Sequence, residues 1–373
     1  RHSGNDHNDT RFKDSFLTSI IAEEGIDVQK STPAHLFINS EYWGVYNIRE
    51  KINEHYIKNN YKINSDSLII LQGLKTVDFG SNKSYIQLRN YIKKNNLKDS
   101  IHYNKVEKEM DTRNYINWWI FQLFIANHDA RGNIRFWKSG LLDDKFRWIV
   151  YDTDLGFQLG DHKDNMIKDF TSPYMTKWYN PQWATLILRN LLKNKEFETD
   201  FINQFFWLTS NKLTTEYLTN RIDWFEQIYD EEMKIHFTRT TNRSLSDRWY
   251  HLERIGRNHK HWKKEVNELK LFALKRPSYF LKHLKQKFKI ETYLLNINII
   301  GKEHGNVMIN KNVLEKSSLS ALFSKKHKLP IEVIPNKGYE TNFTQKFIQT
   351  EKDTLDINIT FKEIPKKYWW RED

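Results

Sequence analysis

Cysteine is absent from this 373-residue chain. Its absence excludes disulfide bonds, zinc sites built on thiolates, and cysteine nucleophiles. The cellular compartment stays open, because a secreted protein can also do without cysteine.

The chain also lacks long apolar segments. No run of about 18 apolar residues occurs in it, so we expect no membrane span. The sequence starts at Arg1, with neither an initiating methionine nor a signal peptide. We interpret it as a fragment or a processed form of a longer protein.

Acidic residues are fewer than basic ones: 47 Asp and Glu stand against 59 Lys and Arg, for a formal net charge of +12. Such a balance can indicate a nucleic-acid partner, but here the lysines are spread along the whole chain, which is typical of a solvated surface. The stretch from Arg243 to Lys264 interleaves cations with aromatic residues. We interpret it as a solvated helical face or a docking surface for an acidic substrate. No nucleic-acid partner is therefore expected.

The composition is that of a globular protein. Apolar residues make up 39% of the chain and aromatic residues 14%, which is more than a disordered chain carries. The length predicts roughly two domains, one of them large enough for a sizeable core.

Hydrophobic periodicity predicts a mixture of helices and strands up to about residue 290. Thr10–Glu24 is an amphipathic helix pattern, and Ala34–Ile38 with Trp43–Ile48 predicts a hairpin. Tyr115–Ala126 is apolar on every side, which indicates a buried helix. From Trp183 to Phe288 the pattern is helical, with an interruption at Pro277.

The pattern changes after Ile290 to short strands separated by Gly and Asn-Lys-Gly turns. We therefore expect a first domain over residues 1–290 and a small β module over residues 291–373. The β module resembles the repeats attached to bacterial surface proteins.

Two acidic clusters flank a second predicted hairpin, formed by Ile134–Lys138 and Phe146–Tyr151. Asp129, Arg131 and Asn133 precede its first strand, and Asp152 and Asp154 follow its second. Because both clusters belong to one end of the hairpin, we expect their side chains to lie close together.

This residue set suits phosphoryl transfer, which needs a carboxylate to orient a hydroxyl and an amide with a carboxylate to hold Mg²⁺ on phosphates. Oxygen ligands are those that Mg²⁺ prefers. The alternative is that these Asp and Asn residues simply populate turns.

Several motifs together resemble the spore-coat protein H (CotH) kinase family. The resemblance covers roughly residues 1–290 and depends on the set rather than on any single motif. The matching segments are Arg1–Asp6, Arg11–Asp14, Gly44–Glu50, Asn127–Asn133, Tyr151–Gly156 and Arg276–Phe280.

The resemblance implies an α+β chain with an atypical protein-kinase-like fold, with an incomplete N-lobe and a helical C-lobe, followed by the small all-β domain. It implies a secreted or cell-surface enzyme that transfers the ATP γ-phosphate to Ser or Thr of extracellular or coat proteins, with Mg²⁺ or Mn²⁺ as cofactor. Its partners would be a nucleotide and a protein substrate. The oligomeric state and a link to the spore coat cannot be read from these residues.

The resemblance to the family implies a role for individual residues of this chain. Asp129 matches the catalytic aspartate of the family, Asn133 the metal-binding amide, and Asp152 the metal-binding aspartate. Asp154 is a second acid for the metal shell, and Glu50 falls where a kinase chain passes beside adenine.

Arg131 has two interpretations. As a catalytic residue it would neutralise the γ-phosphate with its planar guanidinium. As a structural residue it would pair with Asp129 or Asp152.

The chain departs from the ordinary kinase pattern in two ways. Asp129 and Asn133 stand four residues apart, one fewer than in ordinary kinases. We find no Gly-rich phosphate loop and no strand lysine, which we expect ahead of Arg1, so a fragment without them would lack part of its nucleotide site. The competing hypothesis is a catalytically inactive, kinase-like adhesin or binding scaffold.

Overall fold

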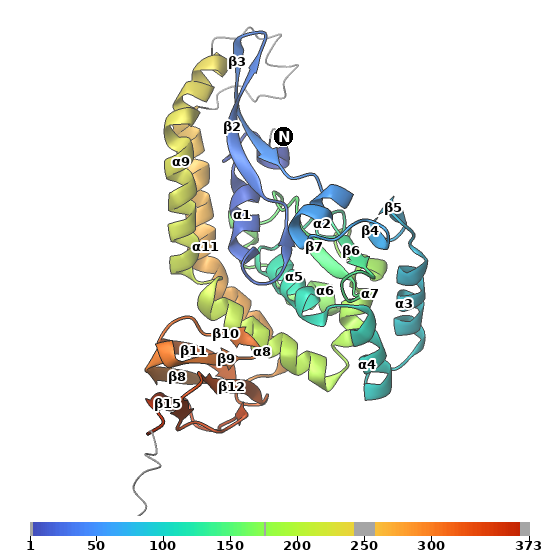
Figure 1. Ribbon diagram of the computed structural model, residues 1–373. Coiled ribbons are helices and arrows are strands. Elements are labelled where there is room, and N and C mark those ends of the chain that lie inside the picture. The colour runs from blue at the N-terminus through green and yellow to red at the C-terminus, as the bar shows by residue number, and fades with distance from the viewer. Residues whose placement is uncertain (1–2, 175–176, 242–257, 366–373) are drawn as a thin grey trace, which may run out of the picture. The chain divides into compact units, whose positions relative to one another are not determined.

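The computed structural model describes residues 3–174, 177–241 and 258–365 (Figure 1). Arg1, His2 and most of the basic stretch that begins at Arg243 lie outside these ranges. The protein is a mixed α+β molecule.

The chain divides into two compact units. The first comprises Arg1–Phe197 and Lys212–Lys287, and the second comprises Glu198–Asn211 and Phe288–Asp373. A single boundary near residue 290 would assign Glu198–Asn211 to the first domain, whereas the observed division groups this segment with the β-rich region.

A five-stranded sheet lies in the first unit, in the order β1-β7-β6-β4-β5. Neighbouring strands are antiparallel except β1 and β7, which run parallel. The pairing of β6 with β7 confirms the hairpin predicted between the two acidic clusters. The strands are β1 (Asp27–Val28), β4 (Leu68–Gln72), β5 (Thr76–Phe79), β6 (Arg135–Ser139) and β7 (Arg147–Val150).

A separate two-stranded sheet pairs β2 (Ser31–Ile38) with β3 (Glu41–Arg49). Its turn residues Asn39 and Ser40 both have positive φ, 49° and 66°, as a tight two-residue hairpin turn requires. The hairpin predicted for this region is confirmed.

The helices of the first unit begin with polar caps where the sequence supplies them. Asp111 accepts a hydrogen bond from the Asn114 amide at 2.9 Å and so caps α5. Every residue of α5 from Asn114 to Phe124 is buried, as its apolar sequence predicts. The helices are α1 (Lys13–Ile21), α2 (Glu54–Tyr61), α3 (Lys83–Lys94), α4 (Ser100–Glu109), α5 (Thr112–Phe124), α6 (Met166–Thr171), α7 (Gln182–Leu191), α9 (Thr215–Thr241) and α11 (His259–Phe288), with single 3₁₀ turns η1 (Gly4–Asp6) and η2 (Leu159–Asp161).

The predicted interruption at Pro277 is wrong, because α11 runs through it. Proline removes one amide donor from a helix and leaves the carbonyl four residues earlier without its usual partner. That carbonyl belongs to Ala273, and it accepts a hydrogen bond from the Thr215 hydroxyl at 3.2 Å. The neighbouring helix α9 thus replaces the missing bond.

The second unit contains two four-stranded sheets, in the orders β10-β9-β12-β14 and β11-β8-β15-β13. Residues of β8 alternate between buried and more exposed positions, as a sheet covered on one face requires. The predicted strands over 294–300, 306–309, 329–333 and 355–361 are all present, whereas β10, β11, β13 and β14 were not predicted. The strands are β8 (Thr292–Ile300), β9 (Gly305–Ile309), β10 (Asn312–Val313), β11 (Ser318–Ser324), β12 (Leu329–Pro335), β13 (Tyr339–Thr341), β14 (Phe347–Ile348) and β15 (Thr354–Glu363), with a 3₁₀ turn η3 (Lys302–His304).

One helical segment belongs to this β unit. Most of α8 (Lys195–Asn211) packs there: the Asn203 amide donates to the Lys328 carbonyl at 2.9 Å, and the Phe206 ring lies 6.2 Å from that of Phe323. Among the described residues, no helix is long and apolar enough to cross a membrane.

Candidate active site

The first acidic cluster lies in the turn between α5 and β6. Ala126 has a φ of 51°, which ends the helix, and Asn127 is fully buried behind it. The Asn127 side chain donates to Gln122 at 2.8 Å and accepts from the Asp129 amide at 2.9 Å. These bonds fix the backbone from which the Asp129 side chain projects.

Gly132 allows the turn to close on Asp129. A Cβ atom at position 132 would lie 2.8 Å from the Asp129 Oδ1 atom. The Gly132 amide also donates to the Asp129 carbonyl at 2.9 Å. The position therefore has no room for a side chain unless the Asp129 carboxylate moves.

Asn133 connects the two clusters. Its Nδ2 atom donates to Asp129 Oδ2 at 3.0 Å and to the Asp152 carbonyl oxygen at 2.9 Å. Asp152 follows β7 and has a φ of 54°, in the left-handed region. The structure thus brings Asp129, Asn133 and the backbone of Asp152 together at one end of the β6–β7 hairpin.

Electrostatics link the same residues. Partial burial raises the pKa of Asp129 above its usual value, the bond from Asn133 opposes that rise, the Asp152 carboxylate adds to it, and Arg131 lowers it. The two carboxylates therefore repel each other at this end of the hairpin, which is an arrangement that a cation would relieve.

The donor set fits a hard divalent cation. Both hydrogens of the Asn133 amide are directed at oxygen acceptors, which leaves its Oδ1 atom as the ligand atom. An amide oxygen and an aspartate carboxylate are ligands that Mg²⁺ and Mn²⁺ accept.

Arg131 lies on the outer side of this turn. Its Nη1 atom donates to the Trp178 carbonyl at 2.9 Å, and its guanidinium lies over the Trp178 ring at 5.5 Å. Arg131 is exposed. As a structural residue, Arg131 was expected to pair with Asp129 or Asp152. The contact observed is with Trp178, in the segment before α7.

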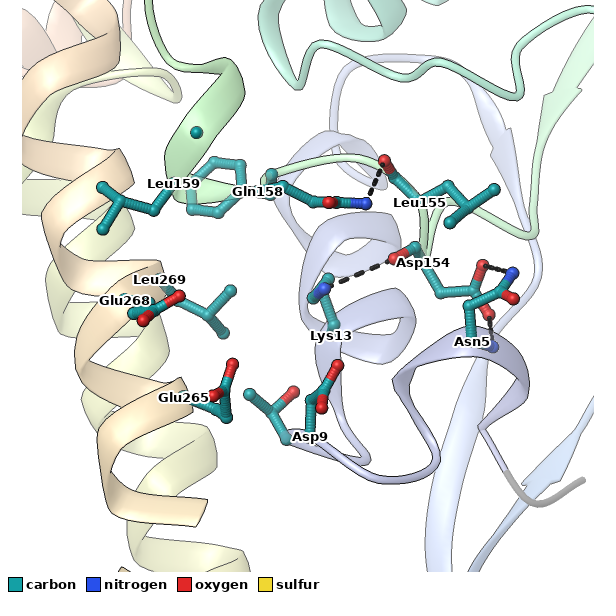
Figure 2. A pocket seen from close by; sticks show the side chains of 13 residues that line it. Asn5, Asp9, Lys13, Asp154, Leu155, Gln158, Leu159, Glu265, Glu268 and Leu269 are labelled. Carbon is teal, nitrogen blue, oxygen red and sulfur yellow. Dashed lines mark hydrogen bonds between the residues drawn. The ribbon is translucent and has the colours of Figure 1, made fainter. Parts of the chain in front are cut away.

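Asp154 points toward a different neighbour. Its carboxylate accepts from the Asn5 amide at 2.8 Å and from the Asn5 side chain at 3.2 Å, and it is 3% exposed. Its backbone carbonyl accepts from Lys13 Nζ at 3.4 Å. Asp154 lines a cavity of about 210 Å³ together with Asp9, Glu265 and other residues. Figure 2 shows these side chains around the cavity.

Glu50 follows β3 and closes the base of the β2–β3 hairpin. Its Oε2 atom accepts from the Lys30 amide at 2.9 Å, and its backbone carbonyl accepts from the Gln29 side chain at 2.6 Å. No contact between Glu50 and the Asp129 cluster is found among the described residues.

Sequence reasoning missed the residue that orients the second cluster. Asp14 of α1 is buried, and its Oδ1 atom accepts from both the Thr153 amide, at 2.5 Å, and the Thr153 hydroxyl, at 2.7 Å. Its other oxygen pairs with Arg49 at the end of β3. Asp14 therefore ties α1 and β3 to the residue between Asp152 and Asp154. Its place beside Arg11–Lys13 in a motif was the only signal for it.

Arg276 anchors the start of the first cluster. It is fully buried and donates to the carbonyls of Phe124 at 2.7 Å and Leu123 at 2.6 Å, at the end of α5. It also donates to the carbonyls of His162 and Asp164. Burial lowers the pKa of Arg276 to about 10, and the nearby carboxylates of Asp164 and Asp161 oppose that change. The guanidinium thus joins α11 to both segments next to the candidate site.

A second group of metal-ligating side chains lies beside the turn. His128 Nδ1 is 3.5 Å from Asp161 Oδ2, and His128 Nε2 is 3.2 Å from Asp164 Oδ2. The three ligand atoms lie within 4.8 Å of one another. The His128 ring also stacks on Tyr179 at 4.7 Å. These contacts hold the loop after β7 against the turn that carries Asp129.

Comparison with known proteins supplies a family. The family model for CotH kinase protein matches residues 1–280. No curated protein matches this chain. The matched region contains every residue of the candidate site, including the buried Arg276. Because the match spans most of the chain, the protein belongs to the CotH kinase family, as its motifs predicted.

Proposed function

We propose that this protein is a protein kinase that transfers the γ-phosphoryl group of ATP to a Ser or Thr hydroxyl. The observation that carries the proposal is the Asn133 amide, which bonds the Asp129 carboxylate and the Asp152 backbone at once. Membership of the CotH kinase family supports kinase activity. We infer the type of acceptor residue and the catalytic competence of this chain.

Asp129 would orient the acceptor hydroxyl. Its carboxylate would accept the hydroxyl hydrogen while the oxygen forms a bond to the γ-phosphorus and the bond to ADP breaks. In a loose transition state, positioning contributes more than proton removal. The raised pKa of Asp129 is compatible with receiving that proton late in the reaction.

Asn133 and Asp152 would hold the divalent cation, which when bound neutralises charge on the ATP phosphates. Asp154 is engaged with Asn5, so we assign it a supporting role: it holds the loop against the N-terminal turn. Arg131, exposed beside Asp129, would meet the phosphate that is being transferred. Glu50 would border the adenine.

We propose further that the protein acts on extracellular or coat proteins from a secreted or cell-surface location. This rests on the CotH family membership and on the resemblance of residues 291–373 to surface-protein repeats. The same features would suit an inactive surface-binding scaffold, so the test must measure nucleotide chemistry directly.

Metal-dependent nucleotide binding distinguishes an active kinase from an inactive binding scaffold. Titration calorimetry with ATP and Mg²⁺ should give binding for the unmodified chain, and Asp152→Asn should weaken it at least tenfold, because one charged ligand is lost. Asp129→Asn should bind ATP nearly as well as the unmodified chain. Asp66→Asn, an exposed aspartate elsewhere in the first unit, is the matched control. If no variant changes ATP affinity, the metal assignment is wrong.

A further inference from the structure

A groove lies between α1, the start of β2 and α9, on a part of the first unit that the candidate active site does not use. Its volume is about 460 Å³. Figure 1 shows α1 and the β2–β3 hairpin alongside α9. One wall is apolar and partly exposed: Trp224 is 47% exposed and Ile228 is 38% exposed. We call this cavity the α1–α9 groove.

Two cations border the groove, Arg221 and Lys30. The Arg221 Nε atom donates to the Ser19 hydroxyl at 3.0 Å, and its guanidinium lies over the Trp224 ring at 4.6 Å and the Phe225 ring at 5.6 Å. An arginine held against aromatic rings and bonded to a hydroxyl has fewer orientations open to its remaining donors.

Neither cation is neutralised by an ion pair among the residues that the structure describes. Glu23 is the carboxylate that lines the groove, and Lys212 is its ion-pair partner. The pKa of Glu23 is lowered mainly by its bond with Lys212, and Arg221 contributes least. The groove therefore combines net positive charge with an apolar wall.

The strand at the rim is open to a polypeptide. β2 pairs only with β3 in the described sheet, so its other edge has backbone groups available for a further strand. Pro33 lies within β2, as is typical of an edge strand, and Thr32 and Pro33 are exposed. An extended peptide could add to this edge and place its side chains in the groove.

We propose that the α1–α9 groove docks an acidic, extended polypeptide segment that carries both carboxylates and apolar side chains. The carboxylates would meet Arg221 and Lys30, and the apolar side chains would cover Trp224 and Ile228. The two kinds of contact lie close together, since Arg221 lies over the Trp224 ring. The proposal does not rest on the phosphotransfer activity, since none of the candidate active-site residues lines the groove.

The test is direct peptide binding. A fluorescent Glu-Phe-Glu-Leu-Glu peptide should bind the full chain, and a Gln-Phe-Gln-Leu-Gln peptide should bind at least about tenfold more weakly, because charge-assisted hydrogen bonds are lost. Arg221→Gln with Lys30→Gln should weaken the acidic peptide by a similar factor. Lys94→Gln, an exposed lysine on α3, should leave the affinity unchanged.

Two results would overturn the proposal: equal binding of both peptides, or equal binding by the double variant. Thermal unfolding of each variant checks that it is folded, and Trp224→Ala, which keeps both cations, tests the apolar wall with an independent change. Sedimentation at several protein concentrations tests whether a second copy of the chain occupies the groove instead. A dimer that the double variant dissociates would assign the groove to that second copy and overturn the proposal.

Discussion

At the scale of single residues, the candidate site depends on close approaches rather than on a large pocket. Asn133 reaches both Asp129 and the Asp152 backbone, and Asn127 holds the Asp129 amide. Asp14 likewise accepts hydrogen bonds from the Thr153 amide and hydroxyl, next to the second acidic cluster. Small changes in the turn that carries Asp129 should therefore affect chemistry before they affect the fold.

Gly132→Ala should lower turnover without unfolding the protein. The added Cβ would meet the Asp129 Oδ1 atom at 2.8 Å, so the carboxylate has to shift. A misplacement of about 1 Å can cost on the order of a hundredfold in rate. Steady-state phosphotransfer should show a lower kcat with a nearly unchanged KM for ATP. An alanine variant with normal kcat would mean that the Asp129 position is not critical.

Asp14→Asn should loosen the loop that carries Asp152. The Thr153 amide and hydroxyl both donate to Oδ1 of Asp14, and Arg49 pairs with its other oxygen. Loss of the charge leaves the buried Arg49 without its counter-ion, which costs about 3–5 kcal/mol in a buried pair. Denaturant unfolding measures this, with Asp66→Asn as the control. A change below about 1 kcal/mol would contradict the assignment.

At the scale of elements, α11 organises the segments around the site. Arg276 donates to carbonyls at the end of α5 and to those of His162 and Asp164. No carboxylate lies within ion-pair distance of its guanidinium among the described residues, so its role is to satisfy backbone groups. Replacement of this residue acts on the turn where the first acidic cluster begins.

Arg276→Met should destabilise the first unit by about 3–5 kcal/mol, because several buried carbonyls lose a charged donor. Arg276→Lys, which can reach fewer of these carbonyls, should recover only part of the loss. Urea unfolding of both variants provides the comparison. Equal stability of the lysine variant and the unmodified chain would show that the forked geometry is unimportant.

Thr215→Val tests how α11 passes through Pro277. The Thr215 hydroxyl donates to the Ala273 carbonyl at 3.2 Å, and valine keeps the shape but not the donor. We expect a loss of about 1 kcal/mol in the free energy of unfolding. Thr219→Val, one turn further along α9, is the control, because its hydroxyl bonds within its own helix. If both variants lose equally, the carbonyl does not depend on α9.

The elements show where sequence reasoning succeeded. Both hairpins, the buried helix α5 and the predicted strands after residue 290 follow from strong local patterns. The continuity of α11 did not, because the bond that permits Pro277 comes from α9, far away in the sequence. The same limit hid the roles of Asp14 and Arg276, because Thr153 and the carbonyls that Arg276 binds lie more than a hundred residues away from them.

At the scale of the whole molecule, stability should depend on pH through buried groups. Burial lowers the pKa of His283 to about 4, and the charge of Arg276 adds to this effect. Since an unfolded histidine titrates near 6.5, the unfolded chain takes up the proton first as the pH falls. Stability from this group is therefore present above about pH 6.5 and is lost progressively toward pH 4.

We expect the stability difference between the unmodified chain and His283→Gln to shrink by about 2 kcal/mol from pH 7 to pH 5. Urea unfolding at both pH values measures it. The comparison must be made between variants, because Asp6 changes the stability in the opposite sense. Burial raises the pKa of Asp6 to about 6, and the nearby Lys13 charge opposes this rise. The stability that Asp6 contributes is therefore lost as the pH rises from about 4 to 6. An unchanged difference would contradict a neutral, buried His283.

The most direct test of the account is transfer of radiolabelled γ-phosphate from ATP, with Mg²⁺ or Mn²⁺, to the chain itself and to a generic protein acceptor. The account predicts transfer by the unmodified chain, loss of transfer in Asp152→Asn, and turnover at least a hundredfold lower in Asp129→Asn with little change in ATP affinity. Transfer that survives both substitutions would contradict the roles assigned to Asp129 and Asp152. Absence of transfer from a folded unmodified chain that also fails to bind ATP would contradict the account as a whole and favour a surface-binding scaffold.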